Sequence, residues 1–149
     1  MEGFSEITQK LLLKAGWSQG RSVDTRRYEQ ALRDEGYPVH EAAVRFLRAF
    51  GGLKVHHPHP KVAGQDDYFT IDPIAAIKRV YKDTVDEYAA RVGAPLCLVG
   101  EAERGYMILA IAADGAVYAG YDDFLVKAGG DPAAAIEAFC RGWDMPQIP

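Results

Sequence analysis

The chain has 149 residues, of which 48% are hydrophobic and 26% charged, the composition of a globular domain that can bury a core of its own. No apolar run approaches the roughly 18 residues of a membrane-spanning helix, and the N-terminus lacks the basic and apolar regions of a secretory signal, so we expect a cytoplasmic protein without a membrane partner. The net charge of −4 combines +3 over residues 1–61 with −7 over residues 62–149, which argues against nucleic acid as a ligand and suits either a basic protein partner or a solvated surface.

Three helices are predicted in the N-terminal third of the chain, over residues 5–16, 24–36 and 38–52. Ser5 and Asp24 are good N-caps, and Pro38 fits the first turn of a helix. A glycine stands at each predicted end, where a residue without a Cβ atom can take a positive φ.

Two strands and two further helices are predicted next. Residues 53–55 alternate as a half-buried strand does, and residues 68–71 are β-branched and aromatic. Asp72-Pro73 is a cap followed by a first-turn proline, and it opens a helix with Tyr81 on its inward side. Thr84–Glu87 has the capping-box pattern of another helix, which stops at Gly93.

The C-terminal part predicts a meander of three strands, over residues 96–100, 106–112 and 116–120. Asp122-Asp123 is predicted to cap a short helix over residues 124–128, and Asp131-Pro132 opens a last helix. This grouping of elements indicates a single α+β domain over residues 1–149, with helices packed against a mostly antiparallel sheet.

The histidine-rich segment of residues 56–59 raises the question of a metal site. His57 and His59 each precede a proline, which favours extended backbone, and alternate residues of an extended chain point the same way. A zinc site needs a third ligand, however, and no nearby residue gives a recognised ligand spacing. We therefore expect an exposed polar loop with no metal and no cofactor, and we retain a metal-dependent hydrolase that uses this loop as an alternative.

Nucleophilic catalysis has no support in the sequence. The serines all lie near the N-terminus, and none stands in a Gly-x-Ser-x-Gly turn. Cys97 and Cys140 lie in apolar surroundings and are expected to be buried hydrophobic residues without a disulfide. We therefore expect no catalytic residues and a protein that is not an enzyme.

Three short motifs follow one another along the chain. They are AGW at residues 15–17, FGGL at residues 50–53, and DGAVYAG at residues 114–120 running into YDDFL. With these motifs in this order, roughly residues 9–142 resemble the SUKH superfamily, and within it the third subfamily of bacterial immunity proteins.

The resemblance implies an α+β fold and a role other than catalysis. Such proteins protect a cell by binding the toxin domain of a polymorphic toxin, which is commonly a nuclease. We therefore expect an immunity protein that neutralises a cognate, basic toxin domain by stoichiometric occlusion. A general protein-interaction or regulatory module is an alternative, because the superfamily fold also occurs outside toxin systems.

Partner contact is predicted for acidic residues and tyrosines of the second half of the chain. Carboxylates would complement a basic toxin surface, and tyrosine adds rigid amphipathic area to an interface. The predicted partner-binding residues are Asp66, Asp67, Tyr68, Glu101, Glu103, Tyr121, Asp122 and Asp123.

Overall fold

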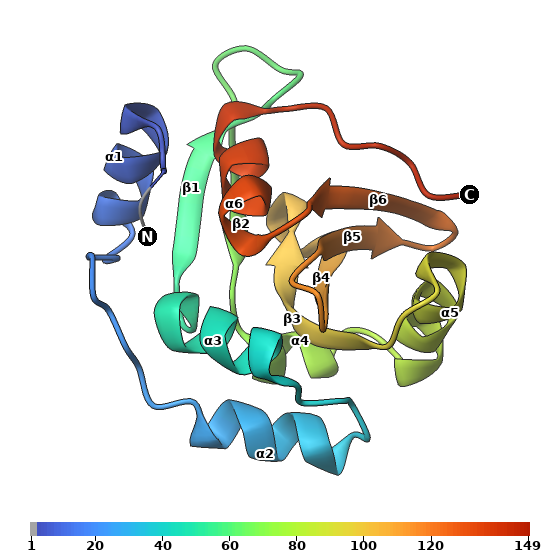
Figure 1. Cartoon of the computed structure of the whole chain (residues 1–149). Helices are drawn as coiled ribbons and strands as arrows, with labels where there is room; N and C mark the ends of the chain where they lie inside the picture. The colour runs from blue at the N-terminus through green and yellow to red at the C-terminus, as the bar shows by residue number, and fades with distance from the viewer. Residues whose placement is uncertain (1–2) are drawn as a thin grey trace.

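The computed structural model describes residues 3–149 and arranges them as helices around one antiparallel sheet (Figure 1). Within these residues there are six α-helices, one short 3₁₀ helix and six strands. In chain order they are α1 (Glu6–Lys14), α2 (Arg26–Asp34), α3 (Glu41–Phe50), β1 (Lys54–Pro58), β2 (Asp66–Thr70), α4 (Pro73–Ile77), α5 (Lys82–Val92), β3 (Leu96–Ala102), η1 (Glu103–Gly105), β4 (Met107–Ala112), β5 (Val117–Tyr121), β6 (Phe124–Gly129) and α6 (Pro132–Arg141). The predicted α+β class and single domain are confirmed.

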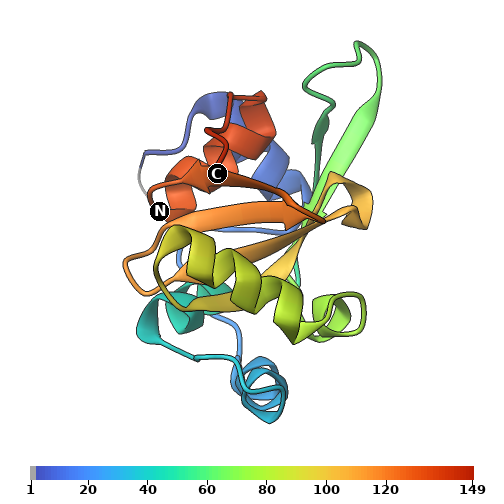
Figure 2. The same ribbon diagram turned by 90° about the vertical axis from the view of Figure 1, so that its right-hand side faces the viewer.

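The sheet is a six-stranded meander in which each strand pairs with its neighbour in sequence, in the order β1-β2-β3-β4-β5-β6. All five pairings are antiparallel. Strands β3 and β4 are buried along their whole length, so both faces of the sheet are covered there. Figure 2 shows β4 to β6 running between α6 on one side and α5 on the other.

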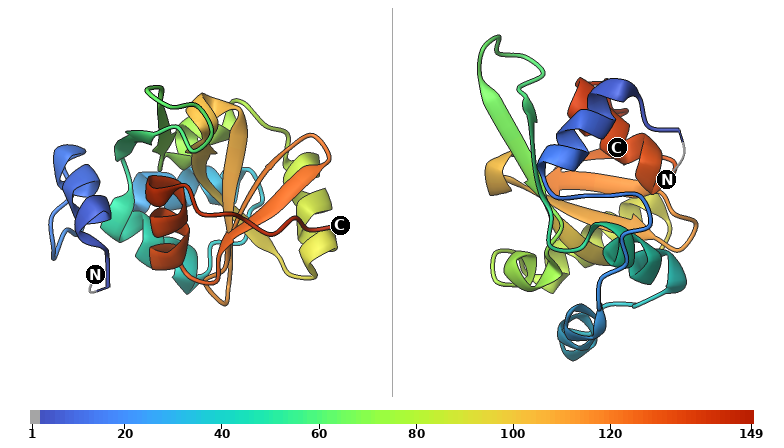
Figure 3. Two further views of the ribbon diagram at one scale, coloured as in Figure 1. Left: turned by 90° about the horizontal axis from the view of Figure 1, so that it is seen from above. Right: turned by 90° about the vertical axis from the view of Figure 1, so that its left-hand side faces the viewer.

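Each outer strand of the sheet lies beside another segment of the chain. The last residues lie along β6, where the Lys127 N–H donates to the Pro146 carbonyl (2.9 Å) and the Ile148 N–H donates to the Leu125 carbonyl (2.8 Å). Helix α1 lies beside β1 (Figures 1 and 3). Covering an outer strand in this way keeps its backbone groups from pairing with another chain.

A buried carboxylate joins the first helix to the last. Glu137 of α6 is 6% exposed, and its Oε2 accepts hydrogen bonds from the Thr8 hydroxyl (2.9 Å) and the Ser5 hydroxyl (3.0 Å). The Ser5 N–H also donates to Oε1. Because Ser5 is the N-cap of α1, this single carboxylate fixes the start of that helix against α6.

Several helix ends are where the sequence predicts them. The side chains of Ser5, Asp72 and Asp131 each accept a hydrogen bond from the N–H three residues on, as N-caps do. Two predicted starts are wrong: Thr25, not Asp24, is the N-cap of α2, and α3 begins at Glu41 after the N-cap His40, not at Pro38.

Helix α5 begins earlier than its capping-box pattern predicts. It starts at Lys82 after the N-cap Tyr81, so Thr84 lies inside the helix. Tyr81 therefore directly precedes the first helical residue of α5. The prediction that Tyr81 points inward is also wrong, because its side chain is 85% exposed.

The helix predicted over residues 124–128 is instead strand β6. Asp122 has a φ of 48°, which reverses the chain in a two-residue turn between the paired residues Tyr121 and Phe124. Aspartate tolerates this left-handed conformation better than most residues do. A five-residue helix gains few backbone hydrogen bonds, whereas residues 124–129 pair along the whole of β5.

Candidate functional site

The predicted partner-binding residues fall into two groups on the structure. Glu101, Tyr121, Asp122 and Asp123 line one concavity of about 780 Å³. Asp66, Asp67 and Tyr68 lie on the β1–β2 hairpin, and Glu103 lies in η1 beside it. We name the first group's location the tyrosine concavity; its lining residues are Arg79, Val80, Tyr81, Thr84, Glu87, Tyr88, Glu101, Gly105, Tyr106, Ile108, Gly120, Tyr121, Asp122 and Asp123.

The floor of the tyrosine concavity is a row of cross-strand neighbours. Glu101 of β3 pairs with Ile108 of β4, which in turn pairs with Gly120 of β5. A Cβ atom on Gly120 would lie 2.8 Å from the ring of Tyr88, so glycine lets α5 pack closely on the sheet. The small residue at this point therefore allows the helix wall to stand directly beside the floor.

Glu101 is a buried carboxylate on this floor. Its side chain is 8% exposed, and Nε of Arg79 lies 3.1 Å from its Oε2. That separation is an ion-pair distance, but among residues 3–149 no donor is aligned for a hydrogen bond to Oε2. Burial raises the pKa of Glu101 above its usual value of 4.5, Arg79 opposes this rise, and Asp72 adds to it.

Exposed tyrosines form the rim of the concavity. Tyr81 is 85% exposed, Tyr106 79% and Tyr121 46%. They come from the residue before α5, the end of the β3–β4 turn and the end of β5. Side chains this exposed contribute little to the protein core and are accessible to a partner.

Two tyrosines of this rim, Tyr81 and Tyr106, are absent from the predicted partner-binding residues. Tyr81 was predicted on the inward side of the helix that opens at Asp72-Pro73, but α4 ends at Ile77 and Tyr81 is the N-cap of α5. Tyr106 directly follows the turn glycine Gly105, whose φ is 91°. The available signal was position: a bulky residue next to a turn stands outside the alternating pattern of the strand that follows.

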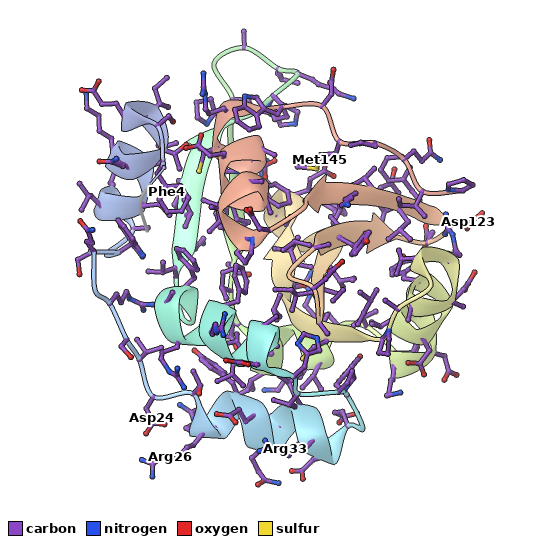
Figure 4. All side chains as sticks on the ribbon, viewed as in Figure 1. Phe4, Asp24, Arg26, Arg33, Asp123 and Met145 are labelled. Atoms are coloured by element: carbon purple, nitrogen blue, oxygen red, sulfur yellow. The ribbon has the colours of Figure 1, made fainter. Side chains whose placement is uncertain are left out.

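The turn between β5 and β6 is held by side chains of α5. The Tyr88 hydroxyl donates to the carbonyl of Asp122 (2.7 Å), and Arg91 Nη1 donates to the carbonyl of Asp123 (2.8 Å). Burial and the nearby Asp122 carboxylate raise the pKa of Tyr88 to about 12. Figure 4 shows Asp123 at the end of the molecule where α5 meets this turn. The two carboxylates of the turn are therefore held in place by backbone contacts and stay free themselves for a partner.

The hairpin group forms a second, more internally paired cluster. Nδ1 of His56 lies 2.7 Å from Oδ2 of Asp66, and this hydrogen bond lowers the pKa of Asp66. The ring of Tyr68 lies 4.2 Å from Nζ of Lys54 and 5.4 Å from the ring of His56. Asp67 is 4% exposed, and its Oδ1 accepts a hydrogen bond from the N–H of Tyr68 (2.7 Å).

The histidine segment is mostly strand and not the exposed loop that we expected. His56 and His57 belong to β1, and His57 is 3% exposed. His59 lies beyond the strand, where its Nδ1 accepts from the N–H groups of Lys61 and Val62 (both 3.1 Å). In the described part of the chain, no group of three or more His, Cys, Asp or Glu side chains could hold a metal ion.

The two cysteines are buried and unpaired, as the sequence predicts. Burial raises the pKa of each thiol to about 12, for Cys97 and for Cys140. The thiolate form of each is therefore strongly disfavoured at neutral pH. None of the helices formed by residues 3–149 is both long enough and apolar enough to cross a membrane.

Comparison with known families gives one match. The model of the SUKH-3 immunity protein family matches residues 4–142, which is nearly the whole chain. No curated protein and no solved structure matched the chain. The matched residues include every residue that lines the tyrosine concavity. The chain belongs to the SUKH-3 immunity protein family.

Proposed function

We propose that the protein is a cytoplasmic immunity protein of a polymorphic toxin system, which binds a cognate toxin domain and neutralises it by stoichiometric occlusion. The family match over residues 4–142 is the observation that carries this proposal. In such a mechanism the protein performs no chemistry, and its affinity and specificity for the toxin are its whole activity.

The tyrosine concavity is the surface that we assign to the toxin. Four carboxylates line it, from Glu87, Glu101, Asp122 and Asp123, against the single guanidinium of Arg79. This local excess of negative charge complements a basic toxin face and would speed its association. The three exposed tyrosines supply the rigid, amphipathic contact area that is enriched at protein interfaces.

The carboxylates of Asp66 and Asp67 in the hairpin group are less available to a basic partner. The Asp66 carboxylate already pairs with His56, and the Asp67 carboxylate is buried against its own strand. Both of these carboxylates already take part in a hydrogen bond, whereas Oε2 of Glu101 has no aligned donor among residues 3–149. We therefore assign the toxin to the concavity and not to the hairpin.

The proposal is tested by co-expressing the protein with the toxin domain encoded beside its gene. We expect cells to survive the toxin only with the immunity protein present, and the two proteins to co-purify at a ratio of one to one. Cell death in the presence of folded, abundant immunity protein, together with no co-purification, would contradict the proposal.

A further inference from the structure

We propose that the tyrosine concavity receives one basic side chain of the toxin domain, arginine or lysine, and that its cation takes the position beside Glu101 that Arg79 occupies in the free protein. This inference rests on the proposed function and adds the chemistry of the group that the toxin presents. Three features carry it: a buried carboxylate, a displaceable internal cation and an aromatic rim.

The buried carboxylate of Glu101 can accept a hydrogen bond that the protein itself does not supply. Glu101 stands on a central strand, 6% exposed, at the floor of the concavity. Removing an ionised carboxylate from water is unfavourable unless charged donors replace the lost hydration. Arg79 supplies a charge 3.1 Å away, but its N–H is not aligned with Oε2, so the carboxylate lacks the hydrogen bond that would complete the pair.

The side chain of Arg79 can move away from Glu101. It lies in the short segment between α4 and α5, and its side chain is 60% exposed, against 8% for Glu101. Its guanidinium packs over Gly105, where a Cβ atom would lie 3.1 Å from Nη2. A half-exposed arginine can return to water at small cost, so it acts as an internal competitor that an incoming cation replaces.

The rim would hold a cation as it enters. The exposed side chains of Tyr81, Tyr106 and Tyr121 line the concavity, and the face of a tyrosine ring attracts ammonium and guanidinium groups. Glu87 and the two carboxylates of the β5–β6 turn add negative potential around the same opening. An arginine or lysine stem would contact the rings while its charged end reaches Glu101.

Other ligands fit this site less well. An anion would meet four carboxylates. A divalent metal ion requires several oxygen ligands around it, and among residues 3–149 no group of three or more His, Cys, Asp or Glu side chains could hold one. A cation on a flexible side chain is the chemistry that can both reach the floor and displace Arg79.

The probe for this inference is N-acetylarginine amide, with N-acetylcitrulline amide as its uncharged isostere. Each is titrated into the isotopically labelled protein while the amide signals of Gly105 and Gly120 are followed by NMR. The proteins compared are the wild type, Glu101→Gln, Arg79→Ala and, as a remote exposed control, Glu35→Gln. Thermal unfolding of each variant establishes that it is folded.

We expect N-acetylarginine amide, and not the citrulline compound, to shift both glycine signals saturably in the wild type and in Glu35→Gln. Glu101→Gln should weaken this binding by about tenfold or more, since it removes the charge of the buried acceptor. Arg79→Ala should bind the arginine probe more tightly than the wild type does, because the competitor is gone. Equal responses to the two probes, or a Glu101→Gln variant that binds as the wild type does, would overturn the inference.

Pull-down of the toxin domain with the same variants separates this inference from the proposed function. If the wild type and Glu101→Gln bind the toxin equally, the basic side chain does not enter the concavity, while the immunity function stands. If the wild type does not bind the toxin, the proposed function fails and the inference fails with it.

Discussion

The hydroxyl of Tyr88 donates a hydrogen bond of 2.7 Å to the backbone carbonyl of Asp122. The bond crosses from α5 to the turn between β5 and β6, 34 residues later in the chain. Asp122 has a φ of 48°, so this bond holds a turn whose first residue is in the left-handed region. The buried side chain of Tyr88 thus fixes the position of an acidic residue through its backbone carbonyl and not through its carboxylate.

Tyr88→Phe should lower the free energy of unfolding by about 1 kcal/mol, because it removes this hydrogen bond and leaves the Asp122 carbonyl without its donor. Urea unfolding of the variant and the wild type measures the difference. Tyr106→Phe is the matched control: its side chain is 79% exposed, and its unfolding free energy should stay within about 0.5 kcal/mol of the wild type. Equal losses in the two variants would show that the Tyr88 hydroxyl has no special role.

Gly120→Ala should destabilise the protein by about 1–3 kcal/mol through overpacking, since the new methyl group would lie 2.8 Å from the Tyr88 ring. Gly130→Ala provides the comparison, because a Cβ atom there has no heavy atom within 4 Å. Thermal unfolding of both variants is the measurement. A Gly120→Ala protein as stable as Gly130→Ala would mean that α5 does not pack this closely on the sheet.

Glu137→Ala should lower the free energy of unfolding by about 2–3 kcal/mol, because it leaves the buried donor of Thr8 and the half-buried donors of Ser5 without their charged acceptor. Hydrogen exchange of the α1 amides should accelerate more than that of β4, since the carboxylate joins α1 to α6. Glu6→Ala, an exposed carboxylate of α1, should change neither observable appreciably. Unchanged exchange in α1 of the Glu137 variant would contradict the assigned role.

The stability of the protein should depend on pH through Glu101. Its pKa is raised in the folded state by burial, with Arg79 opposing and Asp72 adding to the rise. Between the unfolded pKa near 4.5 and the folded pKa, the folded state therefore binds more protons, and its stability falls as pH rises through this window.

Comparing the wild type with Glu101→Gln between pH 4 and pH 7 isolates this effect. Relative to the variant, the wild type should be more stable at pH 4 than at pH 7, because the neutral glutamine does not titrate. Urea unfolding at the two pH values gives the difference. A wild type that gains stability over the variant as pH rises would mean that Arg79 outweighs burial and lowers the pKa of Glu101.

The parts of the fold that sequence reasoning predicts well are those set by neighbouring residues. Ser5, Asp72 and Asp131 cap helices through hydrogen bonds to an N–H three residues away, so the chain itself contains the signal. The family resemblance also rests on such local motifs. The match over residues 4–142 supports the membership that these motifs indicate.

The parts of the fold that sequence reasoning misses depend on contacts between residues far apart in the sequence. Residues 124–128 have the cap and composition of a helix, but pairing with β5 makes them a strand. Arg79 and Glu101 meet only because the β3–β4 pair and the α4–α5 segment fold against each other. The acidic residues were predicted together as partner contacts, and the fold places them in two groups, at the concavity and at the hairpin.

The account depends most directly on whether the toxin binds at the tyrosine concavity. The decisive measurement compares two double variants, each with two acidic residues changed to lysine, by their dissociation constants for the toxin domain. Both variants change the net charge of the protein by the same amount. Glu87→Lys with Asp123→Lys alters the concavity, and Asp66→Lys with Glu103→Lys alters the hairpin; all four side chains are exposed. We predict that the concavity pair weakens binding by about tenfold or more and that the hairpin pair changes it by less than about threefold. Loss of binding in the hairpin pair alone, with wild-type affinity in the concavity pair, would contradict the account.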